Sequence, residues 1–256
     1  MRTDVLDTSE DTVLGGRLRL RQPLRGHRVG HDAILLAAVT EGRAGEHAVD
    51  FGAGVGGAGL ALALRVPGLK VTLVEIDPDL SALAAANARR NALSDRVDAR
   101  TVDVENTQAL AAAGLAAGSA DRVLMNPPFH DTRRQNLSPD PRRRLAHAAP
   151  PGLLTRWIAS AAWVLKPHGV LTLIWRADAL AEVQSALVPA FGGVAVLPVY
   201  PRPDAPAIRM LVRAIKSGGG GPVTYPGLIL NDAQGKPSAA AEAVMRGGEV
   251  LRITES

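Results

Sequence analysis

The segment from Val123 to Phe129 runs from an apolar stretch into an asparagine, two prolines and an aromatic ring. The side-chain oxygen of Asn126 and the carbonyl of Pro127 can both accept hydrogen bonds, and proline adds a fixed φ and no competing N–H. The ring of Phe129 can stack on a flat partner. These residue types suit a site that holds a planar molecule with an amino group, although Asn-Pro-Pro is also a frequent turn.

A second candidate site is the glycine-rich sequence VDFGAGVGGAGL, which follows an apolar stretch and opens a helical pattern. Glycine permits a sharp turn and a close approach of ligand to backbone, and the helix N-terminus offers free N–H groups. Two templates fit. Gly52, Gly54 and Gly57 satisfy G-x-G-x-x-G, the dinucleotide fingerprint. The other template, D-x-G-x-G-x-G, runs from Asp50 to Gly56 and resembles the first motif of class I methyltransferases that use S-adenosylmethionine.

Carboxylates follow two of the predicted strands and could complete a nucleotide-cofactor site. Glu75 ends the strand after the glycine turn, where it can accept hydrogen bonds from ribose hydroxyls of either cofactor, and its neighbour Ile76 is included in the predicted site. Asp103 ends the third strand, where it could accept from an adenine amino group while the Val104 N–H donates to the ring. An ordinary strand-capping aspartate is an equally simple interpretation of Asp103.

The elements that must position these residues alternate, from about residue 46 onward, between apolar strands and amphipathic helices. This alternation predicts an α/β fold with a doubly wound, mostly parallel sheet and helices on both faces. The strands are expected at 47–52, 70–76, 96–104, 121–126 and 169–175, and the helices at 58–66, 78–93 and 152–165. Because the strand at 121–126 should lie beside the glycine-turn strand, its carboxyl end opens onto the crevice where such sheets bind ligands.

Local sequence patterns predict helix starts and further extended segments. Asp77 and Asp32 are expected to cap the helices that follow them, and Pro78 suits a first helical turn. Two extended pieces, 194–201 and 207–215, have no helical pattern between them and predict an antiparallel hairpin at the sheet edge. A further extended piece is expected at 223–232, and a short β-like stretch at 15–24.

Composition limits the function classes. The formal net charge of +4 is a mild indication of a polyanionic partner. The chain has no cysteine, so thiolate metal sites and disulfides are excluded, and its six histidines form no metal-ligand pattern. No metal is therefore expected. Without an apolar leader or an apolar run long enough to span a bilayer, a cytoplasmic protein with no membrane partner is the default expectation.

Asn126-Pro127-Pro128-Phe129 resembles the [D/N]-P-P-[Y/F/W] signature of methyltransferases that act on amino groups conjugated to a π-system. The nitrogen of such a group is a poor nucleophile because its lone pair is delocalised. Acceptors at Asn126 and Pro127 would orient the amine and free the lone pair, while Phe129 stacks on the ring. The resemblance implies an N-methyltransferase with S-adenosylmethionine as cofactor and S-adenosylhomocysteine as product, with Asn126 also near the cofactor.

The segment LRGHRVGHDAILLAAV resembles the one that precedes the glycine turn in the bacterial tRNA(Val) adenine-N6 methyltransferases. The matching residues are Gly26, His27, Arg28, Asp32, Leu35, Leu36 and Ala37. The resemblance extends over most of the chain and implies a Rossmann-like, seven-stranded class I fold. It places Arg28, Gly30 and Asp32 near the methionine end of the cofactor, and it implies adenine N6 in a tRNA as the substrate.

These expectations combine into a single methyltransferase domain over residues 1–256. Residues 1–45 would form an N-terminal hairpin and a helix that covers the cofactor. Residues 46–190 would form the βα core, and residues 191–256 the edge hairpin and a C-terminal tail.

The segment 130–150 is rich in proline and arginine and predicts a mobile loop that contacts RNA phosphates. Its predicted substrate-binding residues, together with Pro128, are His130, Arg133, Arg134, Arg142, Arg143 and Arg144. His130 departs from the family pattern because a further aromatic often stands there. Since no separate RNA-binding domain is evident, a tRNA would be held by this loop or by a second subunit in a homodimer.

Two alternatives stay open at this point. The glutamine-N5 methyltransferases of release factors share the Asn-Pro-Pro turn, but they usually carry a helical domain before the glycine turn. Here only about 48 residues precede that turn, and they include a hairpin. The other alternative is a dinucleotide-dependent reductase, which would need a Tyr-Lys or His-Asp pair near the cleft. Neither Tyr200 nor Tyr225 is followed by a lysine at helical spacing.

Overall fold

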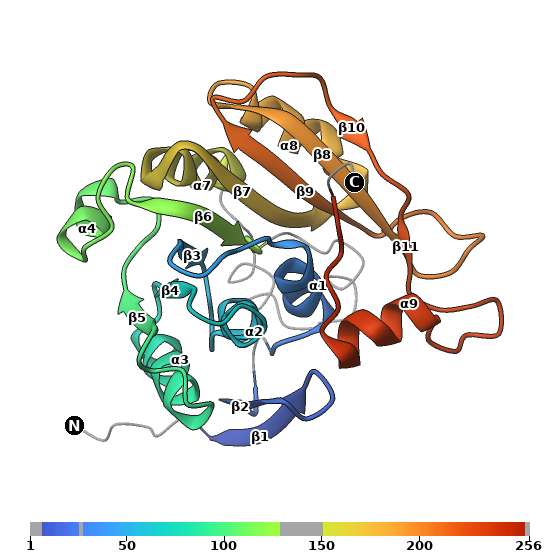
Figure 1. Ribbon diagram of the computed structural model, residues 1–256, viewed down its shortest axis with the longest axis horizontal. Helices are drawn as coiled ribbons and strands as arrows, with labels where there is room; N and C mark the ends of the chain where they lie inside the picture. The colour runs from blue at the N-terminus through green and yellow to red at the C-terminus, as the bar shows by residue number, and fades with distance from the viewer. Residues whose placement is uncertain (1–6, 26–27, 129–150, 254–256) are drawn as a thin grey trace.

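The computed structural model describes residues 7–25, 28–128 and 151–253 and has a mixed, mostly parallel sheet at its centre (Figure 1). The strand order is β10-β8-β9-β7-β6-β3-β4-β5, and β11 also pairs with β8. The strands are β3 (His47–Phe51), β4 (Lys70–Glu75), β5 (Val97–Thr101), β6 (Ala120–Met125), β7 (Leu165–Arg176), β8 (Phe191–Tyr200), β9 (Arg209–Lys216), β10 (Val223–Thr224) and β11 (Leu228–Ile229). The doubly wound α/β fold predicted from the sequence is confirmed.

The seven predicted strands correspond to β3 through β9, and two short strands extend the sheet. β9 lies antiparallel between β7 and β8, which confirms the predicted hairpin, and β10 and β11 run parallel to β8 on its other side. The helices are α1 (His31–Val39), α2 (Gly57–Arg65), α3 (Pro78–Arg90), α4 (Thr107–Ala112), α7 (Leu153–Val164), α8 (Leu180–Leu187) and α9 (Ala239–Glu242). Single turns of 3₁₀ and π helix, η1 (Ala177–Ala179) and η2 (Ala243–Gly247), complete the described helical elements.

The core has two apolar layers, one on each face of the sheet. Successive residues of β6 show why, because Leu124 belongs to one layer while Val123 and Met125 belong to the other. The first layer is covered by α1, α2, α3 and an N-terminal hairpin, and the second by α4, α7 and α8 (Figure 1). Burial on both faces explains the continuous apolar character of the central strands. No helix in the described part of the chain has the length and apolar character needed to cross a membrane.

Helix starts test the capping predictions. Asp77 caps α3 as predicted, since its Oδ1 accepts from the backbone N–H groups of Asp79 at 2.8 Å and Leu80 at 3.3 Å. The prediction that Asp32 caps α1 is wrong. Gly30 is the N-cap and offers no side chain, whereas Asp32 lies in the first turn and pairs with Arg209 at 2.9 Å. The Asp32 carboxylate therefore forms a tertiary ion pair and does not cap its own helix.

The hairpin of β1 (Thr8–Val13) and β2 (Leu18–Pro23) forms a separate two-stranded sheet that packs on α3. Its attachment uses two asparagines one helical turn apart. Asn87 accepts from the Arg21 N–H at 2.7 Å and donates to the Arg21 carbonyl at 3.0 Å. Asn91 does the same with Arg19, at 2.9 and 2.7 Å. The side-chain amides thus satisfy the outer edge of β2 much as another strand would.

Replacing Asn87 by alanine should destabilise the fold. Asn87 is fully buried, and its amide also donates to the Val55 carbonyl at 3.0 Å. Because Asn87→Ala would leave buried backbone groups without partners, we expect the free energy of unfolding to fall by about 3 kcal/mol. Asn91→Ala, at a more exposed position of the same interface, should cost about 1 kcal/mol. Urea unfolding of both variants measures the difference, and equal losses would contradict this account of Asn87.

Candidate active site at the carboxyl edge of the sheet

The strand register brings the two candidate motifs together. Phe51, the last residue of β3, lies opposite Val74 on one side and Met125 on the other. The residues that follow these positions are Gly52, Glu75 and Asn126, so they emerge side by side at the carboxyl edge of the sheet. The glycine turn and the Asn-Pro-Pro turn therefore share one crevice, as the predicted strand order requires.

The backbone of the glycine turn requires glycine at three positions. Gly52, Gly54 and Gly56 have φ values of +67°, +57° and +92°, which an L side chain rarely adopts. Gly57, required by the dinucleotide template, has no positive φ and begins α2. A Cβ at Gly54 would meet nothing within 4 Å, so this turn leaves open space where a ligand can approach the backbone. The three glycines of D-x-G-x-G-x-G thus have left-handed backbones, whereas Gly57 is required by close packing against Val29.

The carboxylate of Glu75 is held in place by backbone N–H groups. It accepts from Gly54 at 2.8 Å through Oε2, and from Ile76 at 2.9 Å and Asp77 at 3.0 Å through Oε1. Each carboxylate oxygen can accept more than one hydrogen bond, so capacity remains for ligand hydroxyls. Ile76 is 63% exposed beside it, which offers an apolar surface to a flat ring.

The predicted adenine contacts lie on the neighbouring strand. Asp103 is exposed and lies just beyond β5, where its Oδ1 accepts from the Glu105 N–H at 2.9 Å. Val104 is buried in the apolar layer beneath. The structure therefore places Asp103 at the rim of the same edge, in an exposed position.

Asp50 joins β3 to α2 from inside the core. It is 2% exposed, and its Oδ2 accepts from the Gly59 N–H at 2.8 Å. Burial, together with the nearby negative charge of Glu75 and against the opposing effect of the Gly59 hydrogen bond, raises the pKa of Asp50 to about 7. A Cβ at Gly59 would lie 2.3 Å from the Leu73 side chain, so only glycine permits this contact. The sequence reasoning did not single out Gly59.

Asn126 carries an unpaired acceptor at the carboxyl edge of the sheet. Its Oδ1 is buried and has no hydrogen-bond partner within the described residues. Buried polar atoms are nearly always paired, so an unpaired one points to a ligand or a functional role. Pro127 is buried and Pro128 is exposed. The remaining predicted substrate and catalytic residues lie outside the described residues: Phe129, His130, Arg133, Arg134, Arg142, Arg143 and Arg144.

The segment before α1 lies at the same edge but is engaged by protein partners. Arg28 pairs with Asp11 and donates to the Pro23 carbonyl at 3.2 Å. Asp32 pairs with Arg209 on β9. Gly30 is exposed with an extended backbone. The matching Gly26 and His27 lie outside the described residues.

Trp157 is a further residue at the site that the sequence reasoning missed. A Cβ at Gly52 would lie 2.5 Å from its ring, so α7 presses directly on the glycine turn. An aromatic residue in an apolar helix gives no indication of such a contact in the sequence. Within the described residues, no group of three or more His, Asp or Glu is arranged to hold a metal.

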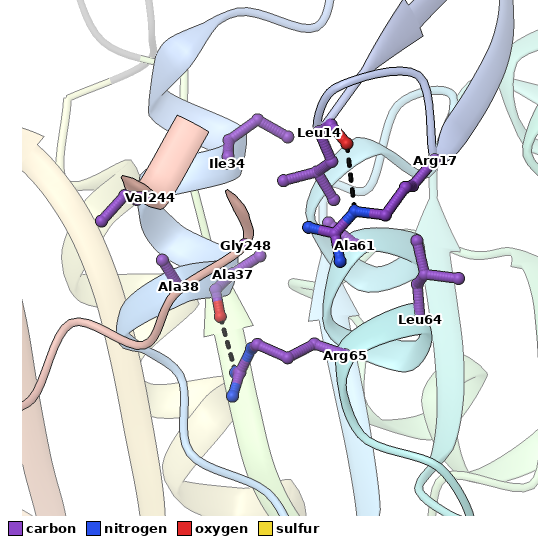
Figure 2. Close-up of a pocket in the computed structure, with 10 residues that line it drawn as sticks. All are labelled: Leu14, Arg17, Ile34, Ala37, Ala38, Ala61, Leu64, Arg65, Val244 and Gly248. Atoms are coloured by element: carbon purple, nitrogen blue, oxygen red, sulfur yellow. Dashed lines mark hydrogen bonds between the residues drawn. The ribbon is translucent and has the colours of Figure 1, made fainter. Parts of the chain in front are cut away.

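A separate cavity of about 160 Å³ lies between the β1–β2 turn, α1, α2 and the C-terminal turn (Figure 2). Two arginines line it. Arg17 donates to the Leu14 carbonyl at 3.2 Å, and Arg65 donates to the Ala37 carbonyl at 2.8 Å (Figure 2). Both arginines tie elements together, and none of the predicted site residues is among the described residues that line the cavity. The crevice at the carboxyl edge is therefore the better candidate site.

Comparison with known proteins agrees with this placement. The family model of the methyltransferase small domain matches residues 29–199. A tRNA1(Val) (adenine(37)-N6)-methyltransferase of Porphyromonas gingivalis is 34% identical over 161 residues, which are 61% of this chain and 62% of that protein. A release factor glutamine methyltransferase of Chlorobaculum tepidum is 34% identical over 162 residues, 61% of this chain and 54% of that protein. The chain thus spans less than two thirds of the length of these relatives.

Among solved structures, one described as a predicted O-methyltransferase of Agrobacterium tumefaciens is similar to this chain. The TM-score is 0.73 and the sequences are 29% identical, over 86% of this chain and 98% of that one.

The raised pKa of Asp50 predicts a pH-dependent stability. In the unfolded chain the carboxyl ionises near its ordinary value of 3.8, whereas in the folded protein it ionises only at about 7. The folded state therefore loses stability as the pH rises between these values, and the loss is complete above about 7. Asp50→Asn removes this loss, so relative to wild type it should gain about 2 to 3 kcal/mol between pH ~5 and pH ~8.

Urea unfolding of Asp50→Asn and wild type at the two pH values measures this change. Asp103→Asn, at an exposed carboxylate of the same edge, is the matched variant. If the stability difference between Asp50→Asn and wild type is the same at both pH values, ionisation of the Asp50 carboxyl does not cause a loss of stability with rising pH.

Proposed function

Because the chain belongs to the methyltransferase small domain family, we propose that it transfers a methyl group from S-adenosylmethionine to an exocyclic amine. The observation that carries the proposal is the buried, unpaired Oδ1 of Asn126 beside the left-handed glycine turn. An acceptor that lacks a partner among the described residues matches a substrate with an N–H to donate. Family membership also decides against a dinucleotide-dependent reductase.

The residues of the crevice fit the proposed cofactor. The carboxylate of Glu75 would accept from the ribose hydroxyls, with Ile76 against the adenine ring and Asp103 and the Val104 N–H at its polar edge. The open backbone at Gly52, Gly54 and Gly56 would lie along the amino-acid portion, with Asp50 fixing the turn. By position, Arg28, Gly30 and Asp32 would lie close to the same portion. When bound, S-adenosylmethionine supplies an electrophilic methyl group on a sulfonium.

The chain's own contribution to the chemistry is to orient the amine. Asn126 Oδ1 and the Pro127 carbonyl would each accept one N–H, which turns the nitrogen lone pair toward the methyl group. In the transfer, the amine nitrogen would gain the methyl group while the sulfur keeps the electron pair of the bond it loses, and the methylated amine would release one proton to solvent. Phe129 would stack on the ring that carries the amine, with Pro128 and His130 beside it.

Adenine N6 in a tRNA is the first candidate substrate. Its support is the N-terminal segment around Arg28 and the similarity to the Porphyromonas gingivalis protein. The arginines between residues 133 and 144 would contact phosphates, directly or with a second copy of the chain in a homodimer. A protein glutamine is the second candidate, favoured by the equal identity to the Chlorobaculum tepidum protein.

Mass spectrometry of nucleosides from tRNA of cells with and without the gene identifies the substrate. We expect N6-methyladenosine in tRNA to be lost with the gene and restored by the wild-type chain, but not by Asn126→Ala. If the tRNA nucleosides are unchanged while a release factor loses a methylated glutamine, the second candidate replaces the first.

Asn126→Ala should separate catalysis from cofactor binding. Loss of one placed acceptor is expected to lower kcat by about 10²- to 10³-fold, because the amine is no longer oriented. The affinity for S-adenosylhomocysteine, measured by calorimetry, should change by less than about threefold, or ~0.7 kcal/mol. Asn126→Asp keeps an acceptor at the same place and should retain more activity. A large loss of cofactor affinity in Asn126→Ala would mean that the residue mainly binds the cofactor.

A further inference from the structure

We propose that Gln22 is a positioning residue of the cofactor site, through which the N-terminal hairpin holds the segment 28–32 against the start of α2. The inference rests on the proposed function only for the consequence that displacing this segment weakens cofactor binding. The contact itself is a property of the chain alone. Gln22 lies on β2 and is not part of the matched family region.

Gln22 uses both ends of its amide within the protein. Its side chain is almost fully buried, with the residue 2% exposed. Oε1 accepts from the Val29 backbone N–H at 2.8 Å, and Nε2 donates to Asp11 Oδ2 at 2.9 Å. A buried amide with both groups paired fixes the direction in which each partner must lie. Gln22 therefore sets the position of the Val29 backbone relative to the hairpin.

Asp11 extends the contact to the neighbouring residue. The same Oδ2 that accepts from Gln22 also accepts from Arg28 and from Ser9 Oγ at 3.1 Å. Arg28 in turn donates to the Pro23 carbonyl at 3.2 Å. Consecutive residues 28 and 29 are thus fastened to the hairpin, one through its side chain and the other through its backbone.

Val29 transmits this position to the glycine turn. A Cβ at Gly57 would lie only 2.6 Å from Val29 Cγ2, so the valine side chain occupies the space above the first residue of α2. Gly57 directly follows Gly56, whose φ of +92° closes the turn. A shift of Val29 would therefore loosen the packing on the helix end that follows the glycine turn.

The segment has no local means of holding this geometry. The N-cap of α1 is Gly30, which forms no side-chain cap, so the segment is fixed by tertiary contacts at its two ends. Gln22 and Asp11 hold residues 28 and 29, and Arg209 holds Asp32 at 2.9 Å. Removing the Gln22 amide would leave the Val29 N–H without its partner and free one end.

The test uses the full chain and three variants. Gln22→Ala removes both hydrogen bonds. Asn91→Ala is the matched control, because it loosens the same hairpin at Arg19 and does not contact residues 28–32. Asp11→Asn keeps an oxygen acceptor for Gln22 Nε2, and with it the Gln22 contact to the Val29 N–H, while it removes the negative charge beside Arg28. Hydrogen exchange of the Val29 amide is measured without any ligand, and S-adenosylhomocysteine affinity is measured by calorimetry.

In Gln22→Ala we expect the Val29 amide to exchange at least about tenfold faster and the affinity for S-adenosylhomocysteine to fall about tenfold. Asn91→Ala should change neither, and Asp11→Asn should leave the Val29 exchange closer to wild type than Gln22→Ala does. Unchanged exchange in Gln22→Ala would overturn the proposal, and so would faster exchange with unchanged affinity. If the wild-type chain does not bind S-adenosylhomocysteine, the proposed function fails, while the exchange measurement still decides whether Gln22 holds the segment.

Discussion

The site depends on one constraint, which is the parallel register of β3 with both of its neighbours. Because Phe51 lies opposite Val74 and Met125, the chain leaves three adjacent strands at the same level of the sheet. A shift of one residue in either pairing would turn Glu75 or Asn126 toward the opposite face. Burial of both faces opposes such a shift, since each strand has apolar side chains in both layers. The packing of the core thereby sets the geometry of the crevice.

The two ends of the described chain reinforce this crevice from outside the core. The hairpin fastens the segment before α1, and the C-terminal segment covers the far end of the same helix. Leu251 donates to the Ala38 carbonyl at 3.0 Å, and Arg17 on the hairpin turn donates to the Gly247 carbonyl. These segments meet across α1 and surround the cavity of Figure 2. α1 is thus held by residues that are far from it in sequence.

The sequence predicted most of what local periodicity determines. The alternation of strand and helix, the edge hairpin and the Asp77 cap follow from residues close together in the chain, and the structure has them. The short helices α4 and α8 were missed because one or two turns give little periodic pattern. Asp32 was misassigned because its partner, Arg209, is remote in sequence. The roles of Gln22, Asn87 and Trp157 were missed for the same reason. In the sequence a buried amide resembles a surface polar residue, and a tryptophan in an apolar helix resembles any core residue. Only their tertiary contacts reveal their partners.

Two residues at the carboxyl edge of the sheet lower the stability of the folded chain. An unpaired buried acceptor such as Asn126 Oδ1 costs about 1 to 3 kcal/mol, and an apolar residue of similar shape would avoid that cost. Asp50, whose pKa is raised to about 7 by burial, adds a second cost at neutral pH. Both lie beside the glycine turn, where three glycines adopt conformations that other residues rarely adopt. Core packing alone would not favour an unpaired acceptor, a buried carboxyl and three unusual backbone conformations at one edge of the sheet. A crevice that must accept a polar ligand and orient an amine requires unpaired acceptors and open backbone.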